Sequence, residues 1–580
     1  MQHNGTPSHH INQKTLKTTR RVRTMNFDAY SVSSISRRGL LLGMGATTAV
    51  AALSACGANE RSAQTTGSAT PTKGGTLTIL MSGTDINWDP GRSQGMAVTS
   101  LALIHRRLTS WRIVKGAEAK VVSDLATDTG RASDGGRTWT FTLKDGLVAE
   151  DGSPITSEQI RHGVERTFAA SLAGGLGYHK TLLAGTSGYT GPYRGKHLKS
   201  IETPGDKTIV FHLKTPFGDW PWIVSMPAFA PVPLKDNPTT YARKPVASGP
   251  YRVAEYKQGV AATLQRNPKW APPSDDVRTA LPDTIVFSMG QDSSVVTQRL
   301  IADSGNDRDA FGAEMVPPAQ LPQVTSNPQA KSRLAVGSAG PLQYLAINVE
   351  RVKDVTVRQA IAHAVDRKAA AAALGGEMGA APATTYITPG IPGRQEYDLY
   401  PESTTKAQEL LRGKKVGQLV LLVSNDEGTL ALAQAIQQAL RKVDISVKIN
   451  PVESETWIEK TTQSDGSDYD LTIASWNPDY PSANANLQPL FASSEIGSGG
   501  FNLGRYHNVE VDRMLADVAA LPMDQAKEKW ARIDRRIAQD VPMVPLVYRR
   551  NAFLHGSGVS DFFVNPFPAY PNYLVMGVQK

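Results

Sequence analysis

The stretch Tyr469-Asp-Leu-Thr-Ile-Ala-Ser-Trp-Asn-Pro-Asp-Tyr-Pro-Ser482 joins a short apolar run to a segment that cannot continue regular structure. The run Leu471–Ala474 has the length and β-branched content of a buried strand. Pro478 and Pro481 lack the amide donor that a helix or a sheet requires, so the strand has to end before them. The stretch therefore predicts a strand and, just past its carboxyl end, two aromatic side chains and one acid: Trp476, Tyr480 and Asp479.

The residues before this stretch alternate between strand and helix patterns. In chain order they predict a strand, a helix, a strand and a helix, at residues 418–424, 430–443, 445–450 and 454–463. Such alternation is typical of an α/β fold with a mainly parallel sheet and right-handed crossovers. Ligands of these sheets bind beyond the carboxyl ends of the strands. An acid beside aromatic rings at that edge favours a ligand with a cation and some apolar surface, although a core tryptophan and a turn-starting aspartate would give the same pattern.

Length and charge narrow the class of protein. A chain of 580 residues is too long for one hydrophobic core, so we expect two or three domains. Hydrophobic residues make up 40% and charged residues 20%, which is ordinary for a soluble globular protein. Of the net charge of +9, residues 1–55 contribute +6 from seven Lys or Arg and one Asp, which leaves +3 for the rest. Because no basic patch remains, nucleic acid is not expected as a partner.

The amino-terminal residues have the pattern of an export signal. Arg37 and Arg38 precede an apolar run of small residues that ends in Leu53-Ser-Ala-Cys56. The arginine pair resembles a twin-arginine export motif, and the end of the run resembles a bacterial lipobox, which implies that Cys56 is acylated. An uncleaved membrane anchor is the alternative, but the apolar run is shorter than the ~20 residues that a span needs. We therefore expect a signal peptide over residues 1–55, a lipid anchor at Cys56 and a location on the outer face of the cytoplasmic membrane.

The residues that follow Cys56 are rich in Ser, Thr, Gly and Ala and have no apolar period. They predict a flexible linker over residues 56–73, with the folded part beginning at Gly74. Cys56 is the only cysteine, which excludes internal disulfides and a thiolate metal cluster. The eight histidines after the signal show no close metal-ligand spacing, and neither a metal nor a cofactor is expected.

One motif suggests a hydrolase. Gly91-Arg-Ser93-Gln-Gly95 matches the G-x-S-x-G nucleophile elbow, in which Ser93 would be the nucleophile. An elbow requires a strand that enters it directly, whereas Pro90 stands immediately before this motif. Neither a zinc-protease H-E-x-x-H motif nor a phosphate-binding P-loop is present in the sequence. We therefore expect no catalytic residue and no enzyme, with a secreted, lipid-anchored hydrolase as the alternative.

Six short motifs, each weak alone, occur in one order and resemble those of the family 5 solute-binding proteins. They are Lys144-Asp-Gly with Glu150-Asp-Gly-Ser-Pro-Ile-Thr156, Ser248-Gly-Pro-Tyr251, Arg266-Asn-Pro268, the helix Val357-Arg-Gln-Ala-Ile-Ala-His-Ala-Val-Asp-Arg367, the segment Asn502 to Leu515, and Val541-Pro-Met-Val-Pro-Leu. Ser248 replaces the usual threonine. This family serves ATP-driven importers and includes oligopeptide-, dipeptide- and nickel-binding proteins. The resemblance extends from Gly74 to the end of the chain.

The resemblance implies a two-lobed α/β clamp, of the kind found in periplasmic binding proteins, with an extra subdomain inserted in the first lobe. The first lobe would be discontinuous, because the chain crosses between the lobes twice. The expected boundaries are 74–115, 201–338 and 545–580 for the first lobe, 116–200 for the insertion and 339–544 for the second lobe. Such a protein captures a solute between its lobes and delivers it, as a monomer, to a membrane permease with its ATPase.

The resemblance also implies a set of ligand contacts. In peptide-binding relatives an acid at the position of Asp479 pairs with the α-amino group of the ligand. Trp476, Tyr480 and Trp88 are the aromatic side chains expected beside it. A peptide would then be bound largely through its backbone, in the manner of an added strand. Peptide cargo is favoured, with nickel chelates, sugars and siderophore-like compounds as alternatives.

Overall fold

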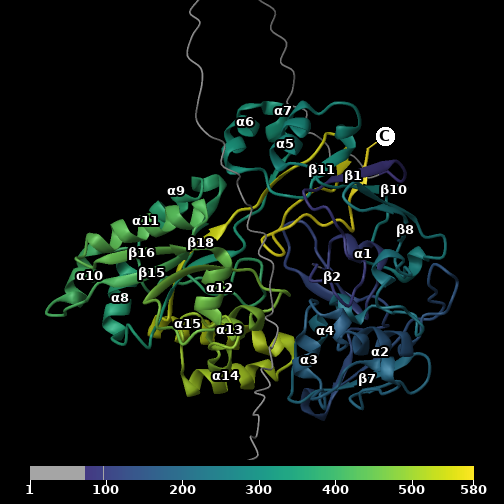
Figure 1. Ribbon diagram of the computed structural model, residues 1–580, viewed down its shortest axis with the longest axis horizontal. Helices are drawn as coiled ribbons and strands as arrows, with labels where there is room; N and C mark the ends of the chain where they lie inside the picture. Colours follow the sequence, from purple (N-terminus) through teal and green to yellow (C-terminus); the bar gives the residue numbers. More distant parts are fainter. Residues whose placement is uncertain (1–71, 96, 580) are drawn as a thin grey trace, which may run out of the picture.

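The computed structural model describes residues 72–95 and 97–579, which form two bodies side by side (Figure 1). One body, coloured green to yellow, surrounds the strands β13 to β18 and is called the second lobe. The other holds the purple, blue and teal residues from before β13 and also receives the last residues of the chain; it is called the first lobe. Cys56, Arg37 and Arg38 lie outside the described residues.

The first lobe is built on a five-stranded sheet. Its strands, in spatial order, are β11 (Ala310–Gly312), β1 (Thr76–Leu80), β10 (Thr284–Ser288), β9 (Ala261–Arg266) and β8 (Tyr251–Lys257). β1 pairs in parallel with β10 and β11, and the remaining pairs are antiparallel. The other elements of this body are α1 (Ser100–Ile104), β2 (Thr109–Arg112), β3 (Lys120–Ser123), α5 (Ser293–Ala302), α6 (Leu321–Ser326), α7 (Pro328–Ser332), β20 (Val559–Ser560) and β21 (Gly577–Val578).

A separate four-stranded antiparallel sheet lies within the first lobe. Its order is β4 (Arg131–Ser133), β5 (Thr138–Thr142), β7 (Thr208–His212) and β6 (Ile201–Glu202). The helices of this part of the chain are α2 (Ser157–Arg166), α3 (Tyr178–Leu182) and α4 (Trp220–Ile223). Thr156 caps α2: its side chain accepts a hydrogen bond from the Gln159 backbone N–H, and the Gln159 side chain accepts one from the Thr156 backbone N–H.

The second lobe is built on a six-stranded sheet. Its spatial order is β14 (Ala380–Pro382), β18 (Met543–Arg549), β13 (Leu342–Ile347), β17 (Leu471–Trp476), β15 (Leu419–Ser424) and β16 (Val447–Val452). Its helices are α8 (Val355–Ala364), α9 (Arg367–Ala373), α10 (Thr404–Leu411), α11 (Glu427–Arg441), α12 (Ser454–Thr462), α13 (Asn484–Phe491), α14 (Val509–Ala519) and α15 (Met523–Asp540).

The strand-helix alternation predicted before Tyr469 is confirmed, but the prediction of a mainly parallel sheet is wrong. β15 pairs in parallel with both β16 and β17. On the other side of β17, however, β13 runs antiparallel to it, and β18 and β14 continue the antiparallel pairing. The sheet is therefore mixed, because strands from outside the predicted segment complete it.

One strand lies across an expected domain boundary, one sheet continues past another, and all of the boundaries stay predictions. β12 (Leu334–Val336) pairs with β19 (Ala552–Leu554), so the chain leaves the first lobe after β12 and returns before β19. β18 belongs wholly to the second-lobe sheet, and its last residue is Arg549 rather than 544. β7 extends the inserted antiparallel sheet to His212, beyond residue 200. We propose boundaries that keep β18 and the four-stranded sheet whole.

The largest cluster of buried apolar side chains is continuous between the lobes. It joins Phe287 and Trp220 of the first lobe to Trp476, Tyr480 and Phe491 of the second. A further cluster fills the second lobe between its sheet and its helices α8, α9 and α11. The two lobes thus pack against each other, and the segment that follows β17 lies at their contact.

Candidate functional site

Asp479 lies where the two lobes meet. The strand β17 ends at Trp476, and the proline-flanked segment after it leaves the sheet toward α3 of the first lobe. The hydroxyl of Tyr178, at the start of α3, donates to the Asp479 carboxylate at 2.6 Å. The ring of Tyr178 also packs edge to face on Tyr480, with ring centroids 5.6 Å apart. The predicted acid is therefore held by a contact that spans 301 residues of sequence.

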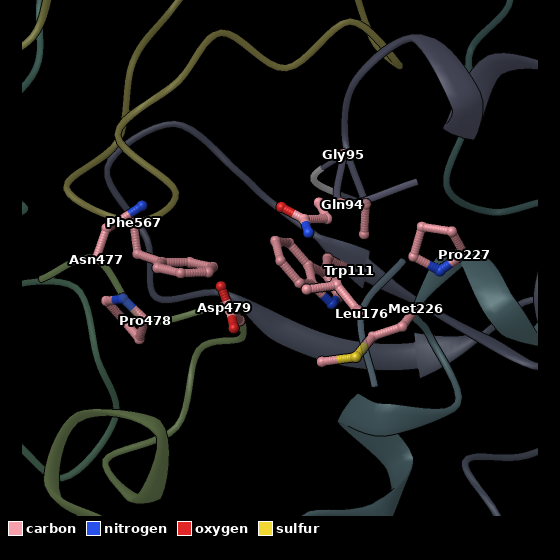
Figure 2. Close-up of a pocket in the computed structure, with 11 residues that line it drawn as sticks. Gln94, Gly95, Trp111, Leu176, Met226, Pro227, Asn477, Pro478, Asp479 and Phe567 are labelled. Carbon is pink, nitrogen blue, oxygen red and sulfur yellow. The ribbon is translucent and has the colours of Figure 1, made fainter. Parts of the chain in front are cut away.

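A small pocket surrounds the carboxylate (Figure 2). It has a volume of about 80 Å³ and is lined by Asp479 together with Gln94, Gly95, Ala97, Trp111, Leu176, Met226, Pro227, Asn477, Pro478 and Phe567. Figure 2 shows the Asp479 carboxylate beside the rings of Phe567 and Trp111, whose centroids are 5.2 Å apart. This volume suits a charged group such as an ammonium, or a few waters, but not a whole peptide.

A larger cavity begins on the other side of the Tyr178–Asp479 contact. It has a volume of about 850 Å³, within the usual range for ligand sites of roughly 300–1,000 Å³. Its walls come from α3 and residues 215–217 of the first lobe and from α13 and α14 of the second. Tyr178 lines this large cavity while its hydroxyl contacts Asp479, which lines the small pocket. The hydrogen bond between Tyr178 and Asp479 therefore joins the wall of the large cavity to the wall of the small pocket.

The aromatic residues predicted beside Asp479 separate into two groups. Trp476 is 3% exposed, donates its indole N–H to the Ala485 carbonyl at 2.8 Å and lines the large cavity. Tyr480 also lines the large cavity, and burial raises the pKa of its hydroxyl well above the usual value. Trp88, by contrast, is fully buried against Phe287 in the first-lobe core and lines neither space.

Trp88 points inward because its loop is tied to the core by the neighbouring acid. The Asp89 carboxylate, itself buried, accepts from both terminal nitrogens of Arg166 in α2, at 2.5 and 2.9 Å. The carbonyl of Trp88 lies 3.1 Å from Nε2 of the buried His105. Burial of that imidazole lowers its pKa to about 4, so the ring is neutral at pH 7. These contacts give Trp88 a role in packing.

Ser93 does not lie on a nucleophile elbow. Its hydroxyl accepts from the Gly95 amide at 2.9 Å, and the side chain is buried. The preceding strand, β1, already ends at Leu80, so no strand enters the motif directly. Within the described residues there is also no group of three or more His, Cys, Asp or Glu side chains arranged to hold a metal ion. In the same part of the chain, no helix combines the length and apolar character needed to cross a membrane.

Several site residues were not found from the sequence. No local sequence pattern marks Tyr178, Trp111 or Phe567. Each is far from Asp479 in sequence, and only the folding of the chain brings it to the site. Asp219 is a further example: its buried carboxylate accepts from the Ser482 hydroxyl at 2.5 Å, across 263 residues. Burial raises the pKa of Asp219 to about 6.

Known proteins resemble this chain over most of its length. A probable D,D-dipeptide-binding periplasmic protein of Escherichia coli is 24% identical over 465 residues, covering 77% of this chain and 83% of the relative. A glutathione-binding protein of Escherichia coli is 26% identical over 453 residues, covering 75% and 82%.

The fold is also that of solved binding proteins. A clavulanic acid biosynthesis oligopeptide-binding protein is 28% identical with a TM-score of 0.80, covering 88% of this chain and 96% of that one. The unliganded open form of a periplasmic murein tripeptide-binding protein has a TM-score of 0.72 at 19% identity, covering 88% and 98%.

The comparison with protein families agrees with both sets of relatives. Residues 120–498 match the model described as bacterial extracellular solute-binding proteins, family 5 middle. This match covers well over half of the chain and includes α3, Tyr178 and Asp479. The relatives are binding proteins rather than enzymes. The chain belongs to the family 5 bacterial extracellular solute-binding proteins.

Proposed function

We propose that this protein captures a peptide with a free amino terminus between its lobes and delivers it to an ATP-binding-cassette permease for import. The observation that carries the proposal is the position of Asp479, a carboxylate at the contact between the lobes with a small pocket beside it. The Tyr178 hydroxyl is neutral, so its hydrogen bond does not cancel the charge of the carboxylate. An ammonium group is the part of a peptide that such a site would bind.

The neighbouring space supports a peptide rather than a single amine. The large cavity starts at Tyr178 and offers aromatic and polar walls to the residues that follow the amino terminus. The names of the relatives agree, since they are binding proteins for a D,D-dipeptide, for glutathione and for a murein tripeptide. We further propose that the protein acts as a monomer, anchored through acylated Cys56 on the outer face of the cytoplasmic membrane.

The test compares a free with a blocked amino terminus. Calorimetry would measure binding of Ala-Ala-Ala and of N-acetyl-Ala-Ala-Ala to wild-type protein and to Asp479→Asn. Removing one partner of a buried charge pair costs about 2–5 kcal/mol. The substitution should therefore weaken Ala-Ala-Ala binding by roughly thirtyfold to several thousandfold. Acetylation of the peptide should weaken its binding to the wild-type protein by a similar factor, and its binding to Asp479→Asn by much less.

Two further variants test whether the weaker binding of Asp479→Asn comes from the lost charge or from a change in structure. Asp524→Asn removes an acid whose side chain is 94% exposed on α15, and binding should be unchanged. Tyr178→Phe removes the hydroxyl that donates to Asp479 but keeps the ring and the carboxylate, so discrimination against the acetylated peptide should persist. Equal losses on acetylation in wild-type protein and Asp479→Asn would show that Asp479 does not bind the amine.

A further inference from the structure

The large cavity has charged groups of one sign only. Its charged lining residues are Glu495, Asp512 and Asp517, and no Lys, Arg or His is among the described residues that line it. Asp512 accepts from the amide and hydroxyl of Ser493 at 2.9 and 2.6 Å, and Glu495 accepts from the Gln488 amide group at 3.1 Å. These donors are neutral groups, and they orient the two carboxylates. The cavity is therefore a region of negative potential.

A buried acceptor in the wall of the cavity gives independent evidence for a ligand. Asn484 is 3% exposed and lines the cavity at the start of α13. Its side-chain nitrogen lies 3.4 Å from the Tyr480 hydroxyl, and its amide donates to the Ser482 hydroxyl at 3.2 Å. Its Oδ1 atom, however, has no hydrogen-bond partner among the described residues. A buried acceptor left without a donor is destabilising, so a ligand N–H at this point would be favoured.

Aromatic rings complete the walls. The lining includes five of them, from Tyr178, Phe217, Trp476, Tyr480 and Phe501. The faces of these rings carry the negative part of the ring quadrupole and therefore attract a cation. The rings also provide apolar surface for the methylene groups of a long side chain. Carboxylates, a lone carbonyl acceptor and aromatic faces together suit a flexible cation with several N–H donors.

We infer that the large cavity takes a basic side chain of the bound peptide, so that the cargo is a peptide with a free amino terminus and an Arg or Lys near it. This inference rests on the proposed function, because Asp479 would hold the amino terminus in the small pocket, next to Tyr178, which lines the large cavity. The guanidinium of arginine fits best, since its five N–H donors can serve the Asn484 oxygen and a carboxylate at once.

The experiment compares charged with uncharged side chains of one shape. Arg-Ala-Ala, Ala-Arg-Ala and Ala-Ala-Arg would each be measured by calorimetry against the same peptide with citrulline in place of arginine, and against Ala-Ala-Ala. In at least one position the wild-type protein should bind the arginine peptide about tenfold more tightly, given the size of partly exposed charge and cation–π contacts. This preference should shrink as the ionic strength rises.

A charge-neutral cavity provides the decisive variant. In Glu495→Gln with Asp517→Asn, the preference for arginine over citrulline should fall to about twofold or less. Asp524→Asn with Glu528→Gln makes the same change in net charge on exposed positions of α15, outside the cavity, and should keep the wild-type preference.

The outcomes separate this inference from the proposed function. Binding of Ala-Ala-Ala without any arginine preference, or an arginine preference that survives in Glu495→Gln with Asp517→Asn, would overturn the cavity assignment and leave the peptide assignment intact. If the wild-type protein binds none of the peptides, the proposed function fails and the cavity assignment fails with it.

Discussion

At the scale of single residues, Asp219 is a buried acid at the contact between the lobes. It precedes α4 in the first lobe and accepts from the Ser482 hydroxyl of the second lobe at 2.5 Å. Its other close neighbours, Tyr480 and Asn484, are neutral at pH 7. Because burial outweighs these hydrogen bonds, the pKa of the carboxyl rises to about 6. The contact between the lobes therefore favours protonated Asp219.

We expect Asp219 to make the free energy of unfolding depend on pH. Its pKa rises from 3.8 in the unfolded chain to about 6 in the folded protein, so the folded protein binds the proton more tightly. The resulting stability is complete below about pH 4 and is lost as the pH rises through 6, by roughly 3 kcal/mol. In Asp219→Asn, the free energy of unfolding measured with urea should change correspondingly less between pH 4 and pH 7.

A second buried acid serves as the comparison. Asp534 lies inside the second lobe and accepts from the Tyr397 hydroxyl at 2.7 Å, and burial also raises its pKa to about 6. Asp534→Asn should remove a similar pH dependence, because the physical cause is the same. Of the two variants, only Asp219→Asn should also make ligand affinity less dependent on pH, because Asp219 contacts the other lobe whereas Asp534 lies within one lobe. If the free energy of unfolding depends on pH in Asp219→Asn as it does in wild-type protein, the Asp219 carboxyl of the wild-type protein is hydrated in solution.

At the scale of elements, the close approach of the lobes depends on Gly218. Its amide donates to the Ala519 carbonyl at the end of α14, at 2.7 Å. A Cβ atom at Gly218 would lie 1.7 Å from the Leu521 carbonyl oxygen, a distance that the two backbones cannot accommodate without moving apart. Glycine is therefore required here by the neighbouring lobe rather than by its own backbone angles.

Gly218→Ala should hinder closure and leave each lobe folded. Because the contact forms only when the lobes meet, we expect Ala-Ala-Ala affinity to fall by at least about tenfold, equivalent to ~1.4 kcal/mol. Circular dichroism should be unchanged, and small-angle scattering should show less compaction when the peptide is added. Gly417→Ala is the control, because a Cβ at Gly417 would meet nothing within 4 Å. Wild-type affinity in Gly218→Ala would contradict this account of closure.

At the scale of the whole molecule, two chain crossings join the lobes and one apolar cluster runs between them. The segment around Asp479 lies between the lobes, where the Asp479 side chain is half-buried and accepts from Tyr178. Exclusion of water strengthens an ion pair at that point, because the effective dielectric constant falls. Under the proposed function, ligand binding would therefore change the shape that a permease meets.

The proposed anchor belongs to this scale as well. Cys56→Ala should abolish incorporation of a fatty-acid analogue and release the protein from the membrane, because lipid chains supply affinity at ~0.8 kcal/mol per buried CH₂. Ser54→Ala keeps the cysteine and a small residue before it, and should remain labelled and membrane-bound. Label retained in Cys56→Ala would contradict the lipobox interpretation.

Local pattern determined much of the second lobe. The predicted strand at 471–474 is β17, which extends two residues further to Trp476, and the predicted elements before it are β15, α11, β16 and α12. These elements could be predicted from the sequence because hydrophobic periodicity and helix capping depend on residues that are neighbours in the chain. The helix expected over Val357–Arg367 is instead two: the backbone is extended at Val365, and Asp366 caps a new helix, α9. The sequence motif did not separate them, because buried residues of both helices belong to the same apolar cluster.

Sequence alone determined the family, the predicted export signal and the position of Asp479 beyond a strand. Only the tertiary structure decided that β13, β18 and β14 make the sheet mixed, that Trp88 is a core residue, and that Tyr178, Trp111 and Phe567 surround the acid. It also decided that the large cavity has carboxylates and no cation among its described lining residues. The reason is physical: periodicity and turn chemistry act over a few residues, whereas these contacts join positions hundreds of residues apart, which become neighbours only when both lobes have folded and met.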